Sequence, residues 1–214
     1  MKTTDEGLDA LVARAAALAQ PGGRRLLGIV GPPGSGKSTL ADALAAGVAA
    51  QGHDVVVVPM DGFHLAQTEL ERLGRAGRKG APDTFDAAGF VALLRRIAKP
   101  GPDVVYAPAF DRALEEPIAG AIPVTPDAQL VMVEGNYLLL DEPPWADARP
   151  MLDEAWYVRL DAAVRVERLI ARHRRFGRGE REAREFVLGS DERNAELVAA
   201  SAERADLIVN VGTW

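Results

Sequence analysis

Cysteine is absent from the 214 residues of this chain, which excludes disulfide bonds, thiolate-bound metals and cysteine nucleophiles. Aromatic residues are also scarce, at 6% of the sequence. No apolar run approaches the roughly 18 residues of a membrane-spanning helix, so we expect no membrane partner. Charged residues interrupt residues 1–20, and we therefore expect this segment to form an amphipathic helix of a cytoplasmic protein, not a signal peptide.

Basic residues are fewer than acidic ones, with 25 Lys and Arg against 31 Asp and Glu and a net charge of −6. Nucleic acids bind to basic surfaces, so we expect no nucleic-acid partner. Hydrophobic residues make up 48% of the sequence and charged residues 26%, as in a soluble globular protein. The length allows one large domain with a substantial core, and we expect residues 1–214 to form that single domain.

Residues 31–38 read Gly-Pro-Pro-Gly-Ser-Gly-Lys-Ser and fit the phosphate-binding pattern G-x-x-x-x-G-K-[ST] of a P-loop. The apolar run before them predicts a buried strand, and the alanine-rich run after them predicts a helix, which is the context that a P-loop requires. The loop N–H groups and the positive end of the helix would bind phosphate oxygens. Lys37 would reach the β- and γ-phosphates of ATP, and the Ser38 hydroxyl would bind Mg²⁺. The predicted nucleotide-binding residues are Gly31, Pro32, Pro33, Gly34, Ser35, Gly36, Lys37, Ser38 and Thr39.

Strands and helices alternate along the sequence. Mainly apolar runs without polar alternation predict buried strands at residues 26–30, 54–59, 129–133, 156–160 and 207–210. Helices are predicted at residues 39–50, 85–98, 161–174 and 191–203, with a short strand at 103–106 and a loop-rich stretch at 108–126. This pattern predicts an α/β fold of the P-loop NTPase type, in which helices sandwich a parallel sheet and ligands bind at the carboxyl ends of the strands.

Two acidic residues follow predicted strands. They lie at the carboxyl ends of the strands, where open α/β sheets bind ligands and carry catalytic residues. Glu134 comes directly after residues 130–133, where P-loop enzymes carry an acid that helps to bind Mg²⁺. Asp61 follows the valine-rich strand and precedes Gly62. It could be the carboxylate that phosphoryl transfer needs beside the attacking hydroxyl, or it could only form an Asp-Gly turn. The local sequence leaves both interpretations open.

Eight arginines lie within residues 165–184. Most arginine-rich runs form a solvated helix face. In a P-loop protein, such a run late in the chain also suits a mobile lid that neutralises charge on the transferring phosphoryl group. We expect a small arginine-rich lid at about residues 172–190, with a hinge at residues 177–180 and with Arg172 acting on the phosphoryl group. Its partner in the lid would be Arg174, Arg175 or Arg178.

Four segments follow one another in a distinctive order. Asp61-Gly62-Phe63-His64 precedes Arg-Lys-Gly-Ala-Pro at residues 78–82, Tyr-Ala-Pro-Ala-Phe-Asp-Arg at 106–112 and Val-Glu-Gly at 133–135. In this order they resemble the P-loop small-molecule kinases of the superfamily that contains uridine kinase, phosphoribulokinase and bacterial type I pantothenate kinase. The resemblance extends from about Leu26 to Val209. The chain also looks like a group of short bacterial kinases called fructose-transport kinases, which share its Asp-Gly-Phe-His, Pro-Ala-Phe-Asp-Arg and Glu-Gly-Asn-Tyr-Leu-Leu segments.

The resemblance assigns roles to individual residues. It implies that Asp61 is the catalytic base and that Arg172 is a lid arginine, and with Lys37 these are the predicted catalytic residues. Ser38 and Glu134 are the predicted metal-binding residues. The predicted substrate-binding residues are His64, Lys79, Tyr106, Phe110, Asp111, Arg112, Asn136 and Asn194.

The sequence therefore predicts an ATP- and Mg²⁺-dependent kinase that phosphorylates a hydroxyl group of a small molecule, with a homodimer as the default for this group. The acceptor stays open among pantothenate, nucleosides and ketohexoses, because the chain is shorter than pantothenate kinase and matches the uridine kinase pocket only in part. One alternative is a GTPase-type switch, since residues 86–89 spell D-x-x-G, although the chain has no Asn-Lys-x-Asp motif. The other is a regulatory nucleotide-binding protein without a small-molecule acceptor, against which the retained lysine, serine and two acids argue.

Overall fold

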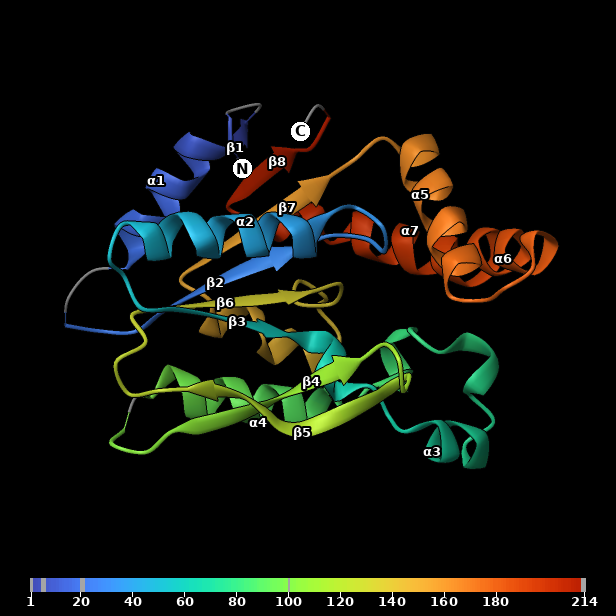
Figure 1. Ribbon diagram of the computed structural model, residues 1–214, viewed down its shortest axis with the longest axis horizontal. Helices are drawn as coiled ribbons and strands as arrows, with labels where there is room; N and C mark the ends of the chain where they lie inside the picture. The colour runs from blue at the N-terminus through green and yellow to red at the C-terminus, as the bar shows by residue number, and fades with distance from the viewer. Residues whose placement is uncertain (1, 5–6, 20–21, 100, 213–214) are drawn as a thin grey trace.

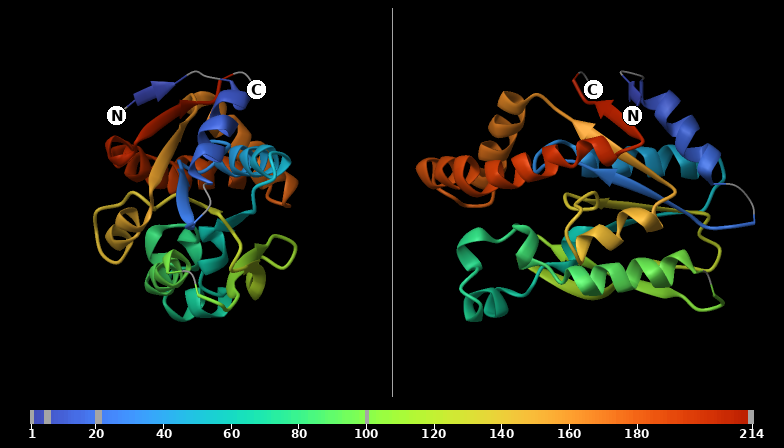
Figure 2. Two further views of the ribbon diagram at one scale, coloured as in Figure 1. Left: turned by 90° about the vertical axis from the view of Figure 1, so that its left-hand side faces the viewer. Right: turned by 180° about the vertical axis from the view of Figure 1, so that it is seen from behind.

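A six-stranded parallel sheet with the strand order β1-β8-β7-β2-β6-β3 forms the core of the computed structural model. The structure describes residues 2–4, 7–19, 22–99 and 101–212. Figures 1 and 2 show helices on both sides of this sheet, so the predicted α/β fold with a parallel sheet between helices is confirmed. The strands are β1 (Lys2–Thr4), β2 (Arg25–Val30), β3 (Val55–Pro59), β6 (Leu130–Gly135), β7 (Glu154–Arg159) and β8 (Leu207–Asn210).

Helices α2, α4 and α5 begin and end within two residues of the predicted helices, α7 ends three residues earlier than predicted, and α3 and α6 were not predicted. None of the described helices is long and apolar enough to cross a membrane. The helices are α1 (Leu8–Leu18), α2 (Lys37–Ala50), α3 (Gln67–Arg72), α4 (Ala87–Ala98), α5 (Ala162–Arg175), α6 (Glu180–Phe186) and α7 (Glu192–Ala200).

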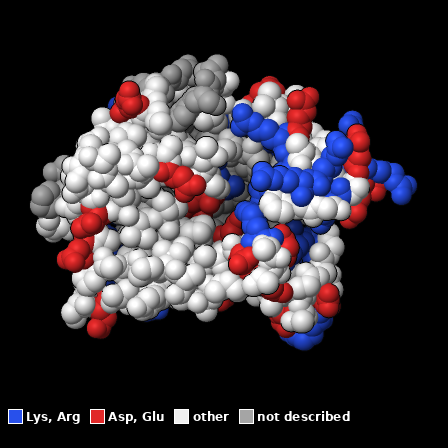
Figure 3. All heavy atoms as spheres, in the orientation of Figure 1, with Lys and Arg blue, Asp and Glu red and all other residues white. Residues whose placement is uncertain are grey.

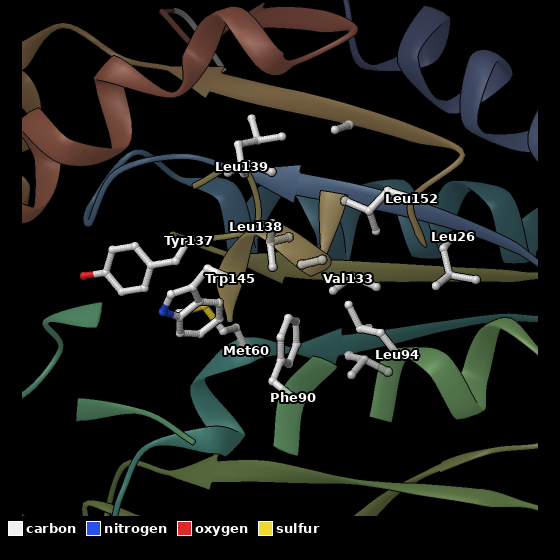
Figure 4. Packing of buried hydrophobic residues seen from close by; sticks show 14 of the residues in the cluster. Leu26, Met60, Phe90, Leu94, Val133, Tyr137, Leu138, Leu139, Trp145 and Leu152 are labelled. Atoms are coloured by element: carbon white, nitrogen blue, oxygen red, sulfur yellow. The ribbon is translucent and has the colours of Figure 1, made fainter. Parts of the chain in front are cut away.

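Alternate residues of the central strands pack on opposite faces of the sheet. In β2, Leu27 and Ile29 belong to the apolar cluster that includes α1 and α2. Leu26 of the same strand belongs to the second cluster, which includes α4. Figure 4 shows this second cluster, in which Phe90 of α4 packs among residues from β6 and the loops that follow it. Burial on both faces explains why the strand sequences are apolar without alternation.

The N-terminal segment differs from the expected single helix over residues 1–20. The helix covers only Leu8–Leu18, and Lys2–Thr4 form the edge strand β1, parallel to Leu207–Val209 of β8. The expectation was wrong because a three-residue polar edge strand carries no hydrophobic period that a sequence pattern could reveal. Residues 1, 5, 6 and 20 lie outside the described residues.

Residues 105–124 form an antiparallel hairpin, whereas the sequence predicted a loop-rich stretch over 108–126. Strand β4 (Val105–Asp111) pairs with β5 (Glu116–Val124), and the register shifts between Ala107 and Ala109. The prediction of a loop was wrong, because this proline-containing segment forms two strands. A two-stranded hairpin consists only of edge strands, where proline is tolerated, and Pro108 lies at the bulge itself. The hairpin contacts the turn η1 (Met60–Phe63) that follows β3.

The arginine-rich end of α5 leads into the region expected to form a lid. Asp161 caps α5 by accepting hydrogen bonds from the backbone of the first turn. Gly177 has a φ of 95°, and this left-handed conformation separates helix α5 from helix α6 within the expected hinge. Residues 187–191 then form a π-helical turn that joins α6 to α7. In Figure 1 this part of the chain projects from one end of the sheet.

Candidate active site

The site lies where β2, β6 and β3 end side by side. Glu134 of β6 is in register with Ile29 of β2 on one side and with Pro59 of β3 on the other. The phosphate-binding loop starts directly after β2, and Asp61 lies directly after β3 in the turn η1. The parallel sheet therefore brings the loop and both predicted acids to one edge, as expected for an α/β fold.

The phosphate-binding loop has the backbone shape that its glycines predict. Gly34 and Gly36 adopt positive φ angles of 77° and 90°. A Cβ on Gly31 would lie 2.9 Å from the carbonyl oxygen of Val158, so only glycine fits there. No side chain caps the start of α2, and its first turn carries no acid, which leaves the positive end of a 14-residue helix open to an anion.

One buried polar atom of the loop also fits a phosphate ligand. The Ser35 side chain is fully buried, and its Oγ has no hydrogen-bond partner within the described part of the chain. A hydroxyl held in this way inside a ring of backbone N–H groups can donate to a bound oxyanion. The loop, the open helix end and the Ser35 hydroxyl thus suit the triphosphate of a nucleotide.

Lys37 and Glu134 face each other at the end of the sheet. The Lys37 Nζ lies 3.5 Å from Oε1 of Glu134, and the two side chains are only 12% and 7% exposed. Burial raises the pKa of Glu134, while Lys37 and a hydrogen bond from Ser38 act in the opposite direction.

The same corner offers oxygen ligands for a hard cation. Ser38, Asp42, Asp61 and Glu134 contribute to the lining of a cavity of about 210 Å³ beside the loop. No cluster of three or more His, Cys, Asp and Glu side chains among the described residues could hold a metal alone. The residues present fit Mg²⁺, which takes oxygen ligands from one or two side chains and completes its shell with phosphate oxygens and water.

Asp61 is an ionised carboxylate in a cationic setting. Its Oδ2 accepts a hydrogen bond from Nη2 of Arg112 at 3.2 Å. Burial acts to raise the pKa of Asp61, but its positively charged neighbours outweigh burial and lower that pKa overall. In order of size, these neighbours are His64, Lys37, Arg112 and Arg172.

His64 lies directly beside Asp61. Its Nδ1 is 2.8 Å from the Asp61 carbonyl oxygen, and its ring is 4.0 Å from the Phe85 ring and 4.8 Å from the Phe110 ring, centroid to centroid. Burial lowers the pKa of His64, and the neighbouring Asp61 carboxylate acts in the opposite direction. The carboxylate and the imidazole therefore shift each other's pKa.

Half of the predicted site residues, including most of the predicted substrate-binding residues, line one cleft of about 680 Å³. Figure 3 shows a hollow in the molecular surface with Lys and Arg side chains gathered around it. The predicted residues that line the cleft are Pro33, Lys37, Asp61, His64, Lys79, Phe110, Arg112, Asn136, Arg172 and Asn194. The lining residues that the sequence did not single out include Gly80, Phe85, Glu115, Phe176, Phe186 and Asp191.

Two predicted substrate residues do not line the cleft. Tyr106 of β4 is 57% exposed to solvent and does not line the cleft. The Asp111 carboxylate accepts hydrogen bonds from the backbone N–H groups of Ala113 and Leu114, at 2.8 and 3.0 Å. Asp111 therefore closes the hairpin turn, and the expectation that these two side chains contact the substrate is not supported.

A loop after the turn η2 (Ala76–Arg78) is held tightly against the sheet. The Gly80 carbonyl accepts hydrogen bonds from the Tyr137 hydroxyl at 2.5 Å and from Asn194 Nδ2 at 3.4 Å. The buried Trp145 indole donates to the Pro82 carbonyl at 3.3 Å and packs against the same loop. Figure 4 shows Tyr137 and Trp145 side by side at this point.

The lid region supplies Arg172 and Arg178 to the cleft. Burial and then repulsion from Arg112 lower the pKa of Arg172, but a guanidinium remains charged at any physiological pH. Within the described residues, no carboxylate forms an ion pair with Arg172, so its charge faces the cleft unpaired. Arg178 lies over the Phe186 ring, 3.9 Å from its centroid. Arg174 instead approaches Glu180 outside the cleft.

The chain is similar to several known proteins. The family of the methylmalonyl Co-A mutase-associated GTPase MeaB matches residues 6–64, which hold the phosphate-binding loop. A candidate uridine kinase from Schizosaccharomyces pombe is 40% identical over 171 residues, covering 77% of this chain and 73% of that protein. A pantothenate kinase from Mycolicibacterium vanbaalenii is 32% identical over 66% of this chain and 49% of its own length.

A solved structure covers nearly the whole fold. The crystal structure of a candidate fructose transport system kinase from Silicibacter sp. TM1040 is 40% identical, with a TM-score of 0.85 over 95% of this chain and 98% of that one. The Bacillus stearothermophilus structure described as a possible uridine kinase has the same fold, at 21% identity and a TM-score of 0.66. With these relatives and with its phosphate-binding loop, the chain belongs to the superfamily of P-loop kinases that includes uridine kinase and pantothenate kinase.

Proposed function

We propose that this protein uses Mg²⁺ and ATP to phosphorylate a hydroxyl group of a small molecule. The observation that carries the proposal is the position of Asp61. This ionised carboxylate lines the same cleft as Lys37 of the phosphate-binding loop and Arg172 of α5, and both cations act on its charge. A carboxylate, a phosphate-binding lysine and an unpaired lid arginine around one space are the groups that phosphoryl transfer to an alcohol requires.

The phosphate side of the site binds and orients the nucleotide. Lys37 and the N–H groups at the start of α2 would hold the β- and γ-phosphates, while Ser38 and Glu134 would hold Mg²⁺ directly or through water. When bound, the metal neutralises phosphate charge and fixes the terminal phosphoryl group for in-line attack. The burial of Lys37 and Glu134 keeps both groups in place before the nucleotide arrives.

The acceptor side positions the hydroxyl that attacks. Arg112 donates a hydrogen bond to Oδ2 of Asp61. The other carboxylate oxygen is then available to take the proton from the hydroxyl group of the substrate. A bond forms between the acceptor oxygen and the γ-phosphorus, the bond from that phosphorus to ADP breaks, and the hydroxyl proton passes to Asp61. Arg172 then faces charge that grows on the transferring group, an interaction that strengthens in the transition state.

The structure gives the D-x-x-G sequence of the GTPase alternative a different role. The Asp86 side chain accepts a hydrogen bond from the Gly89 backbone N–H at 2.8 Å and caps helix α4. The match to a GTPase family ends at residue 64 and thus covers the nucleotide-binding part alone. Neither feature supports a GTP-dependent switch over a small-molecule kinase.

The test is transfer of radiolabel from γ-labelled ATP to a panel of small alcohols, with labelled GTP in parallel. We expect a labelled product that depends on both Mg²⁺ and one class of acceptor. A folded protein that binds ATP tightly and labels no member of a broad panel would instead support the regulatory alternative.

A further inference from the structure

Two cations line the cleft wall formed by the loop after η2 and by the hairpin turn. Lys79 belongs to that loop and Arg112 to the turn between β4 and β5. The Lys79 Nζ lies 5.3 Å from the Phe110 ring centroid, and the Arg112 Cζ lies 5.8 Å from the same centroid. In Figure 1, the hairpin of β4 and β5 lies in the lower half of the view and α5 and α6 lie at the upper right. The cleft is lined by Arg112 of the hairpin turn and by Arg172 and Arg178 of the α5–α6 region.

The charge of Lys79 has no carboxylate to balance it. Its ammonium donates a hydrogen bond to the backbone carbonyl of Glu115 at 2.7 Å, and no ion pair to it occurs among the described residues. Arg112 uses one Nη2 donor on Asp61, which leaves further N–H groups of its guanidinium free to bind an anion. Both cations act to lower the pKa of His64, so their positive fields overlap at the centre of the cleft.

An unpartnered acceptor atom lies in the same cleft. Asn136 is 9% exposed, and its Oδ1 has no hydrogen-bond partner in the described part of the chain. A buried amide oxygen without a partner costs free energy until a donor arrives. The cleft therefore offers two anion-binding groups together with one oxygen that can accept a hydroxyl proton.

We infer that the acceptor is a small hydroxy acid. Its anionic group binds between Lys79 and Arg112, one hydroxyl reaches Asp61, and a second hydroxyl or N–H donates to Asn136. Arginine and lysine bind a carboxylate or a phosphate ester through the same charge-assisted hydrogen bonds. A neutral sugar, polyol or nucleoside gives the Lys79 ammonium no anionic partner and gives Arg112 none besides Asp61. This inference rests on the proposed phosphotransferase function.

The first test measures ADP formation with matched acceptor pairs that differ in one charge. The pairs are glycerate with glycerol, pantothenate with pantothenyl alcohol, and gluconate with sorbitol. Glycerol 3-phosphate is also compared with glycerol, to test whether the anionic group is a phosphate ester instead of a carboxylate. We expect at least one acid to exceed its neutral partner at least tenfold in kcat/KM. A neutral member that matches or exceeds its acid would refute the inference while leaving the kinase proposal intact. ATP binding without turnover of any member of the panel counts against both proposals.

The second test removes one charge from the cleft. In Lys79→Gln, the amide can still donate to the Glu115 carbonyl, so the loop keeps its hydrogen bond and loses only the charge. We expect the KM for the acidic acceptor to rise at least tenfold, with kcat and the KM for ATP within about twofold of wild type. Lys99→Gln, the same change on the exposed end of α4, should alter none of these values. An unchanged acceptor KM in a folded Lys79→Gln protein would refute the inference.

Discussion

Replacement of Asp61 by Asn separates a kinase from a protein that only binds nucleotide. Asn has the shape of Asp, but it carries no negative charge and cannot take a proton from the acceptor. In the structure, Arg112 donates to one carboxylate oxygen of Asp61. The amide oxygen of Asn would keep that partner, because only the oxygen can accept from a guanidinium. The NH₂ group would then face the acceptor hydroxyl, where the second carboxylate oxygen had been.

This geometry sets the expected size of the effect. A positioned general base contributes a factor of about 10² to 10⁴ in rate, and loss of that factor raises the barrier by about 3 to 5 kcal/mol. Phosphoryl transfer with a loose transition state depends less on the base, which favours the lower half of that range. ATP affinity should change little, because Lys37 and the start of α2 hold the phosphates.

The pH dependence of the wild-type enzyme gives a second test of the same residue. The cationic neighbours lower the pKa of Asp61 below the ordinary aspartate value of about 4, so the carboxylate is ionised throughout the neutral range. The Asp61 charge therefore stabilises the folded state above that ordinary value, and this contribution is lost as the pH falls through the lowered pKa. The difference in Tm between wild type and Asp61→Asn should accordingly be largest at neutral pH and should shrink in strong acid.

The assay pairs calorimetric binding of a non-hydrolysable ATP analogue with steady-state turnover on the same preparation. Asp83→Asn is the matched control, because Asp83 pairs with the exposed Arg78 outside the cleft lining. We expect normal turnover in the control and a loss of at least 100-fold in Asp61→Asn. Normal turnover in a folded Asp61→Asn protein would show that the residue only forms a turn.

Three further substitutions test other parts of the site. Lys37→Ala should abolish transfer and weaken ATP binding without unfolding the protein, measured by calorimetry and thermal denaturation, since the side chain faces the phosphate site. Arg172→Ala should lower kcat more than it raises the KM for ATP, whereas Arg181→Ala, with a side chain 92% exposed, should change neither; equal effects in steady-state assays would contradict the lid assignment. Trp145→Ala should lower the free energy of unfolding by about 3 to 5 kcal/mol, measured by urea denaturation, because a buried indole is lost. A loss below about 1 kcal/mol would show that Trp145 is not a packing anchor.

The phosphate-binding corner could be predicted from the sequence because its determinants are local. The loop residues are contiguous, and Glu134 lies in a strand that its neighbours bury on both sides. Asp61 follows the next strand of the same sheet, so the parallel register alone brings these groups together. The strands β2, β3, β6, β7 and β8 were predicted to within two residues for the same reason, since each has a mainly apolar run.

The acceptor side could not be predicted in full because it depends on tertiary contacts. Tyr106 and Phe110 are four residues apart on β4, and a regular strand would place them on the same face. The bulge between Ala107 and Ala109 interrupts that alternation, so Phe110 lines the cleft while Tyr106 faces solvent. No sequence pattern marks this bulge apart from Pro108, which had suggested a loop.

The sequence could not show which arginine lies beside Arg172 in the cleft. The spacing did not distinguish Arg174, Arg175 and Arg178, because all three flank the expected hinge, and of these three only Arg178 lines the cleft. The break at Gly177 redirects the chain, so that Arg178 lines the cleft and Arg174 lies beside Glu180.

The carbonyl oxygen of Gly80 contacts two parts of the molecule that are far apart in the sequence, the segment after β6 and helix α7. It accepts one hydrogen bond from Tyr137, which follows the central strand β6, and another from Asn194 of α7, which continues from α6 through the π-helical turn. The loop that carries Lys79 is thereby hydrogen-bonded to α7, the helix that follows the α6 segment and its neighbour Arg178. A ligand that bound beside Lys79 and displaced this carbonyl would therefore also remove a contact of α7, and any coupling that this produced between two ligands would be reciprocal. One backbone oxygen is thus a shared contact of the Lys79 loop, the segment after β6 and helix α7.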